Sequence, residues 1–300
     1  MSDKKLAIKL STLEAIGAAV RNKEGTTDLI PVNTLANRIE ALPSGVSKLP
    51  QVVDKTITEI TTEDLAGATS IGSYMFWGCQ SLRIVAIPNG VTRIGNNAFY
   101  YCISLTDITI PDTIARMETQ AFYACSNLTN VYYDGDIASW CNTEVTNLDA
   151  SPLCYAGKLY IKNSGTNEYE LLTNLVIPDS VTEIKPCVFY GYVSLTSVTI
   201  GNGVTSIDSN MLLECYNLID FTISSPIVQS ISFKHSTKLT IDSLKNIINA
   251  LADYYGTDDD GKYTLTLNSA CNATLEAEGA TAPDGLTWRE YAQFKGWNLV

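Results

Sequence analysis

The chain repeats one pattern of residues at an interval of 23 residues. The stretch AFYYCISLTDITIPDTI at residues 98–114 follows MFWGCQSLRIVAIPNGV at 75–91 and precedes AFYACSNLTNVYYDGDI at 121–137. Each unit keeps a Phe, a Cys, a Leu and an apolar-x-apolar pair. One unit alone buries too few side chains to offset the entropy lost when its backbone is ordered. Neighbouring units must therefore stack and share one core, which predicts a solenoid.

Aligned at this interval, the apolar residues fall into columns that we expect to point into the core. The columns are Phe76, Phe99, Phe122, Phe189 and Leu212; Cys79, Cys102, Cys125, Tyr192 and Cys215; and Leu82, Leu105, Leu128, Leu195 and Leu218. The apolar-x-apolar pair has the period of a short strand, and a proline often ends it. The Phe and Cys stand three residues apart, which predicts a helical or 3₁₀ turn on the other side of each unit.

The interval is interrupted after Tyr133. We predict an enlarged repeat around residues 134–161, whose strand lies at 158–161. A short unit then leads to residues 175–177, where the usual interval resumes. Because the strand column stays in step, we interpret this region as a bulge on one face of a continuous solenoid.

Two segments resemble BspA-type leucine-rich repeats: IPNGVTRIGNNAFYYCISLTDITIP and IPDSVTEIKPCVFYGYVSLTSVTIGNGVTSI. The inserted segment that begins VYYDGDIASWCN resembles an enlarged repeat of the same family. The resemblance covers roughly residues 54–233. It implies a right-handed solenoid with a sheet on one face, used for binding and not for chemistry. The departures are Tyr192 in the Cys column, Leu212 in the Phe column and Ser224 at the proline position, and they fall in the last units.

The two ends lack the repeat. Residues 11–23 begin with a capping box and residues 34–42 form a second short apolar stripe, so we predict a helical hairpin. At the other end we predict a helix at 241–254, a strand at TLTLN, a helix at 288–295 and a final WNLV strand. The amino-terminal segment resembles a short module of bacteriophage tail and fibre proteins, and the carboxyl-terminal segment resembles the closing module that follows BspA-type repeats in structural proteins of bacteriophages.

The predicted fold class is therefore an α/β repeat, a leucine-rich-repeat solenoid with a helical N-terminal module and a small α/β C-terminal cap. The predicted domains are an attachment module at 1–46, the solenoid at 47–233 and a capping module at 234–300. The caps cover the apolar rung and the strand edges that an open solenoid exposes.

The composition argues against several functional classes. The net charge of −12 disfavours a nucleic-acid partner. Eight cysteines without a CxxC or an export signal predict reduced thiols, and a single histidine, His235, predicts no zinc site. We expect His235 to lie exposed in a loop, and the acidic run at 257–261 to form a solvated hairpin turn. We expect no catalytic residue, metal or cofactor, and no membrane insertion.

The side chains that point outward from the sheet are the candidate binding residues: Tyr132, Thr109, Thr199, Thr222, Asp107 and Asn130. One interpretation is an ordinary Thr-rich sheet surface. The other is a shallow platform for a glycan or a protein, with Tyr132 as an anchor. Four tyrosines on the turn side offer a second patch: Tyr100, Tyr101, Tyr123 and Tyr190.

The main functional hypothesis is a non-enzymatic virion protein of a bacteriophage, in the tail, fibre or head-decoration class. Its N-terminal module would bind other virion proteins or form a homo-oligomer, and its repeat surface would contact a host protein or glycan. The alternative is a bacterial cell-surface adhesin of the same repeat family. An enzyme carried on the repeats is a third hypothesis that no residue pattern supports.

Overall fold

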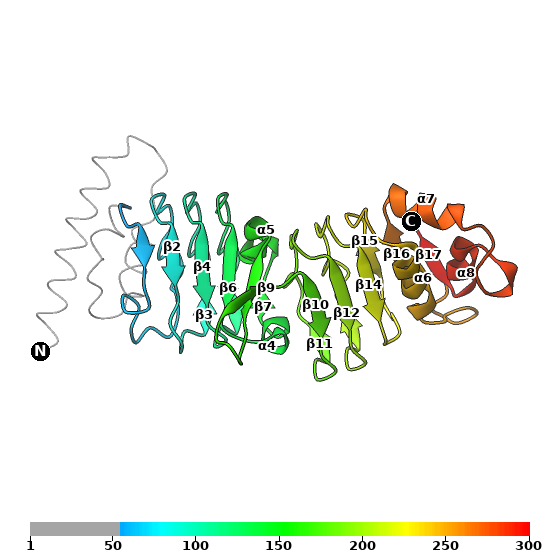
Figure 1. Cartoon of the computed structure of the whole chain (residues 1–300), viewed down its shortest axis with the longest axis horizontal. Helices are drawn as coiled ribbons and strands as arrows, with labels where there is room; N and C mark the ends of the chain where they lie inside the picture. The colour runs from blue at the N-terminus through cyan, green and yellow to red at the C-terminus, as the bar shows by residue number, and fades with distance from the viewer. Residues whose placement is uncertain (1–54) are drawn as a thin grey trace, which may run out of the picture.

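The 23-residue interval produces parallel strands that pair in register. A computed structural model describes residues 55–300, so the predicted helical module at 1–46 lies outside the described residues. Strand β4 (Asp107–Ile110) pairs with β6 (Asn130–Tyr133) residue for residue, and each repeat adds one strand to the ladder. Every second side chain of each strand points into the core, so buried and more exposed side chains alternate along it. Figure 1 shows the strands stacked along the long axis.

The first half of the solenoid has two ladders. The larger is a six-stranded sheet of β1 (Glu59–Ile60), β2 (Ile84–Ala86), β4, β6, β8 (Leu159–Lys162) and β9 (Tyr169–Leu171). The smaller consists of β3 (Arg93–Ile94), β5 (Arg116–Met117) and β7 (Glu144–Val145). The buried side chains of both ladders belong to the same core.

The Phe and Cys columns close the core on the turn side. The rings of Phe76, Phe99 and Phe122 stack with centroids 5.2 and 5.3 Å apart. The backbone N–H of Cys102 donates to the carbonyl of Phe99, three residues earlier, which is the hydrogen bond of the predicted 3₁₀-type turn; these segments are single turns and do not extend into a helix. The thiol of Cys102 donates to the carbonyl oxygen of Phe76 at 3.1 Å, one repeat earlier. A small residue with a weak donor fits this position, which accounts for the cysteine column.

All three core columns are buried at every position from Phe76 to Leu218. The predicted alignment across the enlarged repeat is also confirmed, because Tyr133 pairs with Ile161. Two short helices and a 3₁₀ turn replace the simple turns of this repeat. They are α4 (Ile137–Cys141), η1 (Leu148–Ala150) and α5 (Leu153–Ala156).

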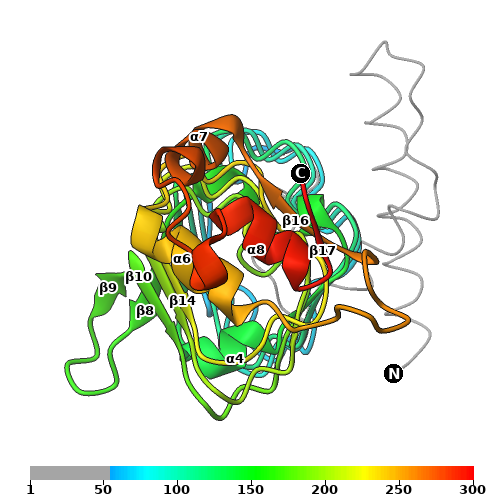
Figure 2. The same ribbon diagram turned by 90° about the vertical axis from the view of Figure 1, so that its right-hand side faces the viewer.

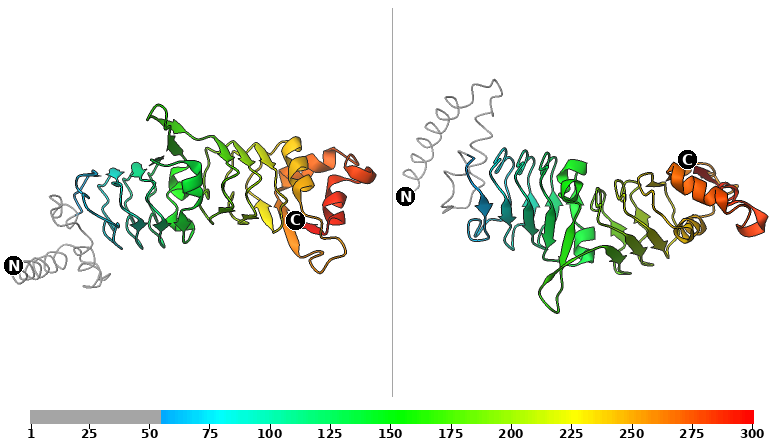
Figure 3. Two further views of the ribbon diagram at one scale, coloured as in Figure 1. Left: turned by 90° about the horizontal axis from the view of Figure 1, so that it is seen from below. Right: turned by 45° about the horizontal axis from the view of Figure 1, so that its top comes forward.

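The expected continuity of the sheet is wrong at one point. After β8 the chain turns back and forms β9 antiparallel to it, and β10 (Asn174–Ile177) then starts a separate sheet. The polar segment 163–168 favours this reversal, because the side chain of Asn163 accepts from the N–H of Gly165. The β8–β9 hairpin projects from the body of the solenoid (Figures 2 and 3).

The second half of the solenoid repeats the design of the first. Its sheets are β10, β12 (Ser197–Ile200) and β14 (Asp220–Ile223), and the pair β11 (Glu183–Ile184) and β13 (Ser206–Ile207). The buried apolar residues of both halves form a single cluster. The ladder is therefore interrupted while the core continues.

The carboxyl end is closed by a small α/β unit, as expected. It contains β15 (Ile231–Phe233), α6 (Ile241–Ala250), β16 (Tyr263–Leu267), α7 (Ser269–Ala277), η2 (Pro283–Gly285), α8 (Trp288–Phe294) and β17 (Trp297–Leu299). Strands β15, β16 and β17 form a parallel sheet, and Figure 2 shows the helices at this end. Helix α6 ends earlier than expected, because Leu251 forms a bridge with Ile227. Strand β15 and helix α7 were not predicted.

Candidate binding surface

The predicted platform is divided between two sheets. Asp107 and Thr109 lie on β4, directly beside Asn130 and Tyr132 on β6. The side-chain amide of Asn130 donates to Asp107 Oδ1 at 2.8 Å. Thr199 and Thr222 pair with each other on β12 and β14, beyond the interruption of the sheet, and both are exposed. The six predicted residues therefore form one group of four and one group of two.

Two tyrosines that were not predicted join Tyr132 on the six-stranded sheet. Tyr160 stands beside Tyr132 in the ladder, and their rings stack at 4.9 Å. Tyr169, on the projecting hairpin, meets the ring of Tyr132 edge-on at 5.0 Å. All three side chains are half-buried. The offset of 28 residues that aligns Tyr133 with Ile161 also aligns Tyr132 with Tyr160, so the sequence contained this signal, whereas nothing in it placed Tyr169.

Two charged residues fix the ring of Tyr169. Its hydroxyl donates to Asp134 Oδ1 at 2.7 Å, and Lys162 Nζ lies 3.1 Å from the same oxygen. Burial, together with the hydrogen bond to Asp134 and its charge, raises the pKa of Tyr169. The phenol is therefore a protonated hydrogen-bond donor at neutral pH. We call Tyr132, Tyr160, Tyr169, Asp134 and Lys162 the tyrosine cluster.

The second predicted patch is a stacked column on the turn side. Tyr100 lies between Trp77 and Tyr123, with ring centroids 6.4 and 4.9 Å away. Tyr101 packs on Tyr100 at 5.4 Å and is 44% exposed. Tyr190 is buried in the second half of the solenoid and belongs to no such column. The stacking of these rings on one another indicates packing between repeats as their main role.

His235 has a structural role that differs from the expected one. It is half-buried, and its Nδ1 accepts a hydrogen bond from the backbone N–H of Glu214 at 3.1 Å. Its ring lies 5.5 Å from that of Tyr216. The predicted position in a turn is confirmed, but the predicted exposure is wrong, because the end of the last repeat needs an acceptor for an otherwise unpaired N–H.

The acidic run at 257–261 is a largely exposed turn, as predicted, but it does not close a hairpin. It precedes β16, which pairs parallel with both of its neighbours. Asp259 lies 2.7 Å from Lys262, and Asp260 accepts from the N–H of Gly256. Within residues 55–300, no group of three or more His, Cys, Asp or Glu side chains has a geometry that could hold a metal ion.

Most of the cysteines lie in buried surroundings that keep their thiols protonated. All eight are free thiols. Burial raises the pKa of Cys125, Cys141, Cys154 and Cys215 to about 12. A thiol must lose its proton to act as a nucleophile, so these side chains are poor nucleophiles at neutral pH.

Alkylation measures this property directly. At pH 8 a thiol with a pKa of about 12 holds a thiolate fraction of only about 10⁻⁴. We expect iodoacetamide to modify these cysteines in the native chain at least about 100-fold more slowly than in the unfolded chain, as followed by mass spectrometry. Non-reducing and reducing gels should match. Equal native and unfolded rates would contradict the buried, protonated state.

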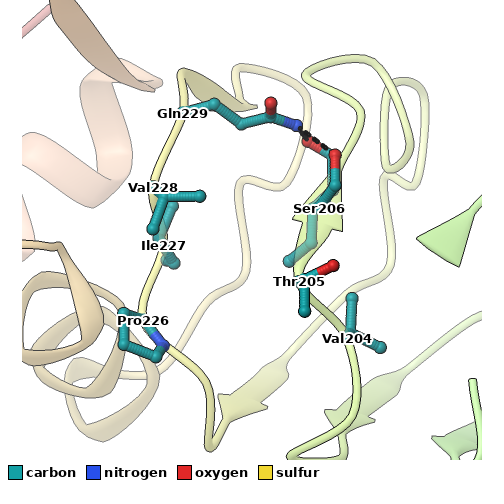
Figure 4. A pocket seen from close by; sticks show the side chains of 8 residues that line it. Val204, Thr205, Ser206, Pro226, Ile227, Val228 and Gln229 are labelled. Carbon is teal, nitrogen blue, oxygen red and sulfur yellow. Dashed lines mark hydrogen bonds between the residues drawn. The ribbon is translucent and has the colours of Figure 1, made fainter. Parts of the chain in front are cut away.

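A hollow lies between β13 and the segment 226–229. Figure 4 shows the Gln229 side chain reaching across it to Ser206, where Nε2 donates to Oγ at 3.2 Å. Val204, Thr205, Pro226, Ile227 and Val228 line the rest of the hollow. Its volume of about 10 Å³ is close to the minimum for one water molecule, so it is too small for a ligand.

A comparison with protein families decides what kind of chain this is. The model of the BspA type leucine-rich repeat region matches residues 54–148 and 161–255, in six copies. The chain belongs to the BspA type leucine-rich repeat family. The family resemblance drawn from the sequence is confirmed, and the unmatched interval between the two ranges contains helix α5 of the enlarged repeat. No curated protein matches the chain.

Several solved leucine-rich repeat structures match the chain at low sequence identity. The Treponema pallidum leucine-rich repeat protein is 21% identical over 65% of this chain and 77% of its own, with a TM-score of 0.38. A leucine-rich repeat protein from Bacteroides ovatus is 16% identical over 67% of this chain and 53% of its own, with a TM-score of 0.32. A leucine-rich cell surface protein from Faecalibacterium prausnitzii is 18% identical over 77% of this chain and 76% of its own, with a TM-score of 0.27.

Proposed function

We propose that this leucine-rich repeat protein is a non-enzymatic binding protein whose ligand surface is centred on the tyrosine cluster. The observation that carries the proposal is the meeting of three tyrosine rings on the outward face of the sheet. The core lies on the other face, so these rings add nothing to its packing. Neighbouring outward positions carry small residues such as Ala86 and Thr109. Tyrosine combines a large apolar ring with a polar tip, which suits it to binding surfaces.

The environment of the polar groups supports a binding role over catalysis. Burial keeps the thiols of Cys125, Cys141, Cys154 and Cys215 protonated. His235 accepts a hydrogen bond from the backbone of the last repeat. The two charged side chains of the tyrosine cluster, Asp134 and Lys162, form an ion pair with each other. Such a surface offers stacking, hydrogen bonds and shape to a macromolecule or a glycan.

We propose the bacterial cell surface as the place of action, ahead of a virion. The family match rests on the repeats, and none of the matched structures named above is a virion protein. In the part of the chain that the structure describes, no helix is long and apolar enough to cross a membrane. The virion hypothesis, with partners bound through residues 1–46, makes a separate prediction. Washed cell envelopes should contain the protein under our proposal, whereas purified phage particles should contain it under the other.

Substitution of the central ring tests the binding surface. The full chain is screened on a glycan array and on an array of extracellular proteins, and the strongest interaction is then measured by surface plasmon resonance. We expect Tyr132→Ala to weaken it about tenfold or more, because a central aromatic contact typically contributes at least 1–2 kcal/mol. Tyr160→Ala should have a similar effect.

The matched control lies on the other sheet. Thr222→Ala changes an exposed side chain at the equivalent ladder position of β14, and its affinity should equal that of the unchanged protein. Wild-type affinity in a folded Tyr132→Ala variant would remove the tyrosine cluster from the binding surface.

A further inference from the structure

The interruption of the sheet leaves strand β10 with an open edge. Thr173 and Ile177 accept hydrogen bonds from β12, at Ser197 N and Gly201 N. Because alternate residues of a strand point their backbone groups to opposite sides, the N–H and C=O groups of Asn174 and Val176 point away from β12. Within residues 55–300, these outward groups have no backbone partner. Unpaired strand edges of this kind bind other strands readily.

The opposite edge of the same sheet is covered. On β14, the N–H of Phe221 donates to Ser243 Oγ and the N–H of Ile223 donates to Asn246 Oδ1, each at 3.0 Å. Both acceptors belong to helix α6, which lies along this edge. Among the described residues, side-chain acceptors thus serve the β14 edge of the three-stranded sheet, whereas none serves the outward N–H groups of β10.

There is room beside the open edge. An open cleft of about 460 Å³ is lined by the β8–β9 hairpin and by residues 172–174, which lead into β10. Val176 is 60% exposed, although it is apolar and stands in a strand. Leu175 and Ile177 point into the core, so the strand itself is held firmly while its edge remains accessible.

We propose that the edge of β10 binds an extended, cationic segment of a partner protein by strand addition. The free N–H and C=O groups of Asn174 and Val176 recognise an extended backbone, and an added strand continues the ladder that is interrupted there. The carboxylates near the edge select the charge of the partner. Glu170 lines the cleft, and Asp179 follows β10 at an exposed position.

The lysine that lines the cleft, Lys162, is paired with Asp134, so within residues 55–300 no lysine forms an ion pair with Glu170 or Asp179. A second copy of this chain is a poor partner for the β10 edge, because its net charge of −12 would be repelled by the same carboxylates. This inference is independent of the tyrosine cluster as a ligand surface. Tyr132→Ala should therefore leave binding at the β10 edge unchanged, so that failure of one proposal is distinguishable from failure of the other.

The probe is a fluorescein-labelled synthetic peptide, Lys-Lys-Ser-Val-Thr-Ile-Lys-Lys, whose four central residues repeat the sequence of β12. Its affinity for the full chain is measured by fluorescence anisotropy. Val176→Pro removes the outward N–H, which the native ladder does not use, and edge strands tolerate proline. We expect Val176→Pro to weaken binding about tenfold and Val176→Thr, which keeps the N–H, to bind like the unchanged protein.

Two further measurements complete the test. Peptide binding should slow hydrogen exchange at the amides of Asn174 and Val176 in the unchanged protein, a result that does not depend on the folding of any variant. A peptide with glutamates in place of the lysines should bind at least about tenfold more weakly. Equal affinity for Val176→Pro, exchange that stays unchanged, or no binding of the lysine peptide at 1 mM would overturn the proposal. So would a dimer in sedimentation that Val176→Pro abolishes, because the edge would then belong to a second copy.

Discussion

Phe99→Ala is expected to lower the free energy of unfolding by about 3–5 kcal/mol. Phe99 is fully buried, and its ring lies between those of Phe76 and Phe122 in nearly parallel stacks. The cavity left by the ring can collapse little, because the backbone carbonyls of the repeats before and after are fixed by hydrogen bonds. One of these hydrogen bonds runs from the N–H of Phe99 to the carbonyl of Ala121, in the next repeat. Urea unfolding followed by circular dichroism measures the change.

Thr109→Ala is the matched control for this change. Thr109 lies in the same repeat, but on the outward face of β4. A surface substitution of this kind should change stability by no more than about 0.5 kcal/mol. If the two variants unfold at the same urea concentration, the Phe column is not the structural centre of the solenoid.

The repeat interval accounts for the parts of the fold that the sequence could predict. A fixed spacing determines both which residues point inward and which strands are neighbours, so the buried columns and the Tyr133–Ile161 pairing followed from alignment alone. The same arithmetic could have placed Tyr160 beside Tyr132. The pattern needed no knowledge of distant contacts, because each repeat touches mainly the next one.

The parts that were not predicted depend on local reversals and on contacts between distant segments. The β8–β9 hairpin arises from a short polar turn whose strand, Tyr169–Leu171, is too brief to give a periodic signal. This hairpin determines the position of Tyr169, and it leaves the edge of β10 unpaired. His235 was misjudged for a related reason, because its partner, the N–H of Glu214, lies 21 residues away in the preceding repeat.

Trp140→Ala is expected to cost about 3–5 kcal/mol and to separate the unfolding of the two halves of the solenoid. Trp140 is buried in α4 and packs edge-on against Tyr133 of the first half, with ring centroids 4.9 Å apart. Its indole N–H donates to the carbonyl of Val188, in the second half, at 3.0 Å. The sheet itself is interrupted between β8 and β10, so this side chain supplies coupling that the ladder does not. Repeat proteins lose cooperativity when the interface between neighbouring units weakens.

Differential scanning calorimetry should therefore show one transition for the unchanged protein and two for Trp140→Ala. Trp140→Phe is the matched control, because it keeps most of the ring contact with Tyr133 and removes the donor to Val188. It should cost about 1–3 kcal/mol, the range for leaving a buried acceptor unpaired, and keep a single transition. Hydrogen exchange resolves the halves separately, since the amides of β12 and β14 and those of β4 and β6 should exchange at different rates if coupling is lost. A single transition in Trp140→Ala at an unchanged temperature would show that the backbone bond from Lys185 N to the Cys141 carbonyl and the shared core join the halves without the indole.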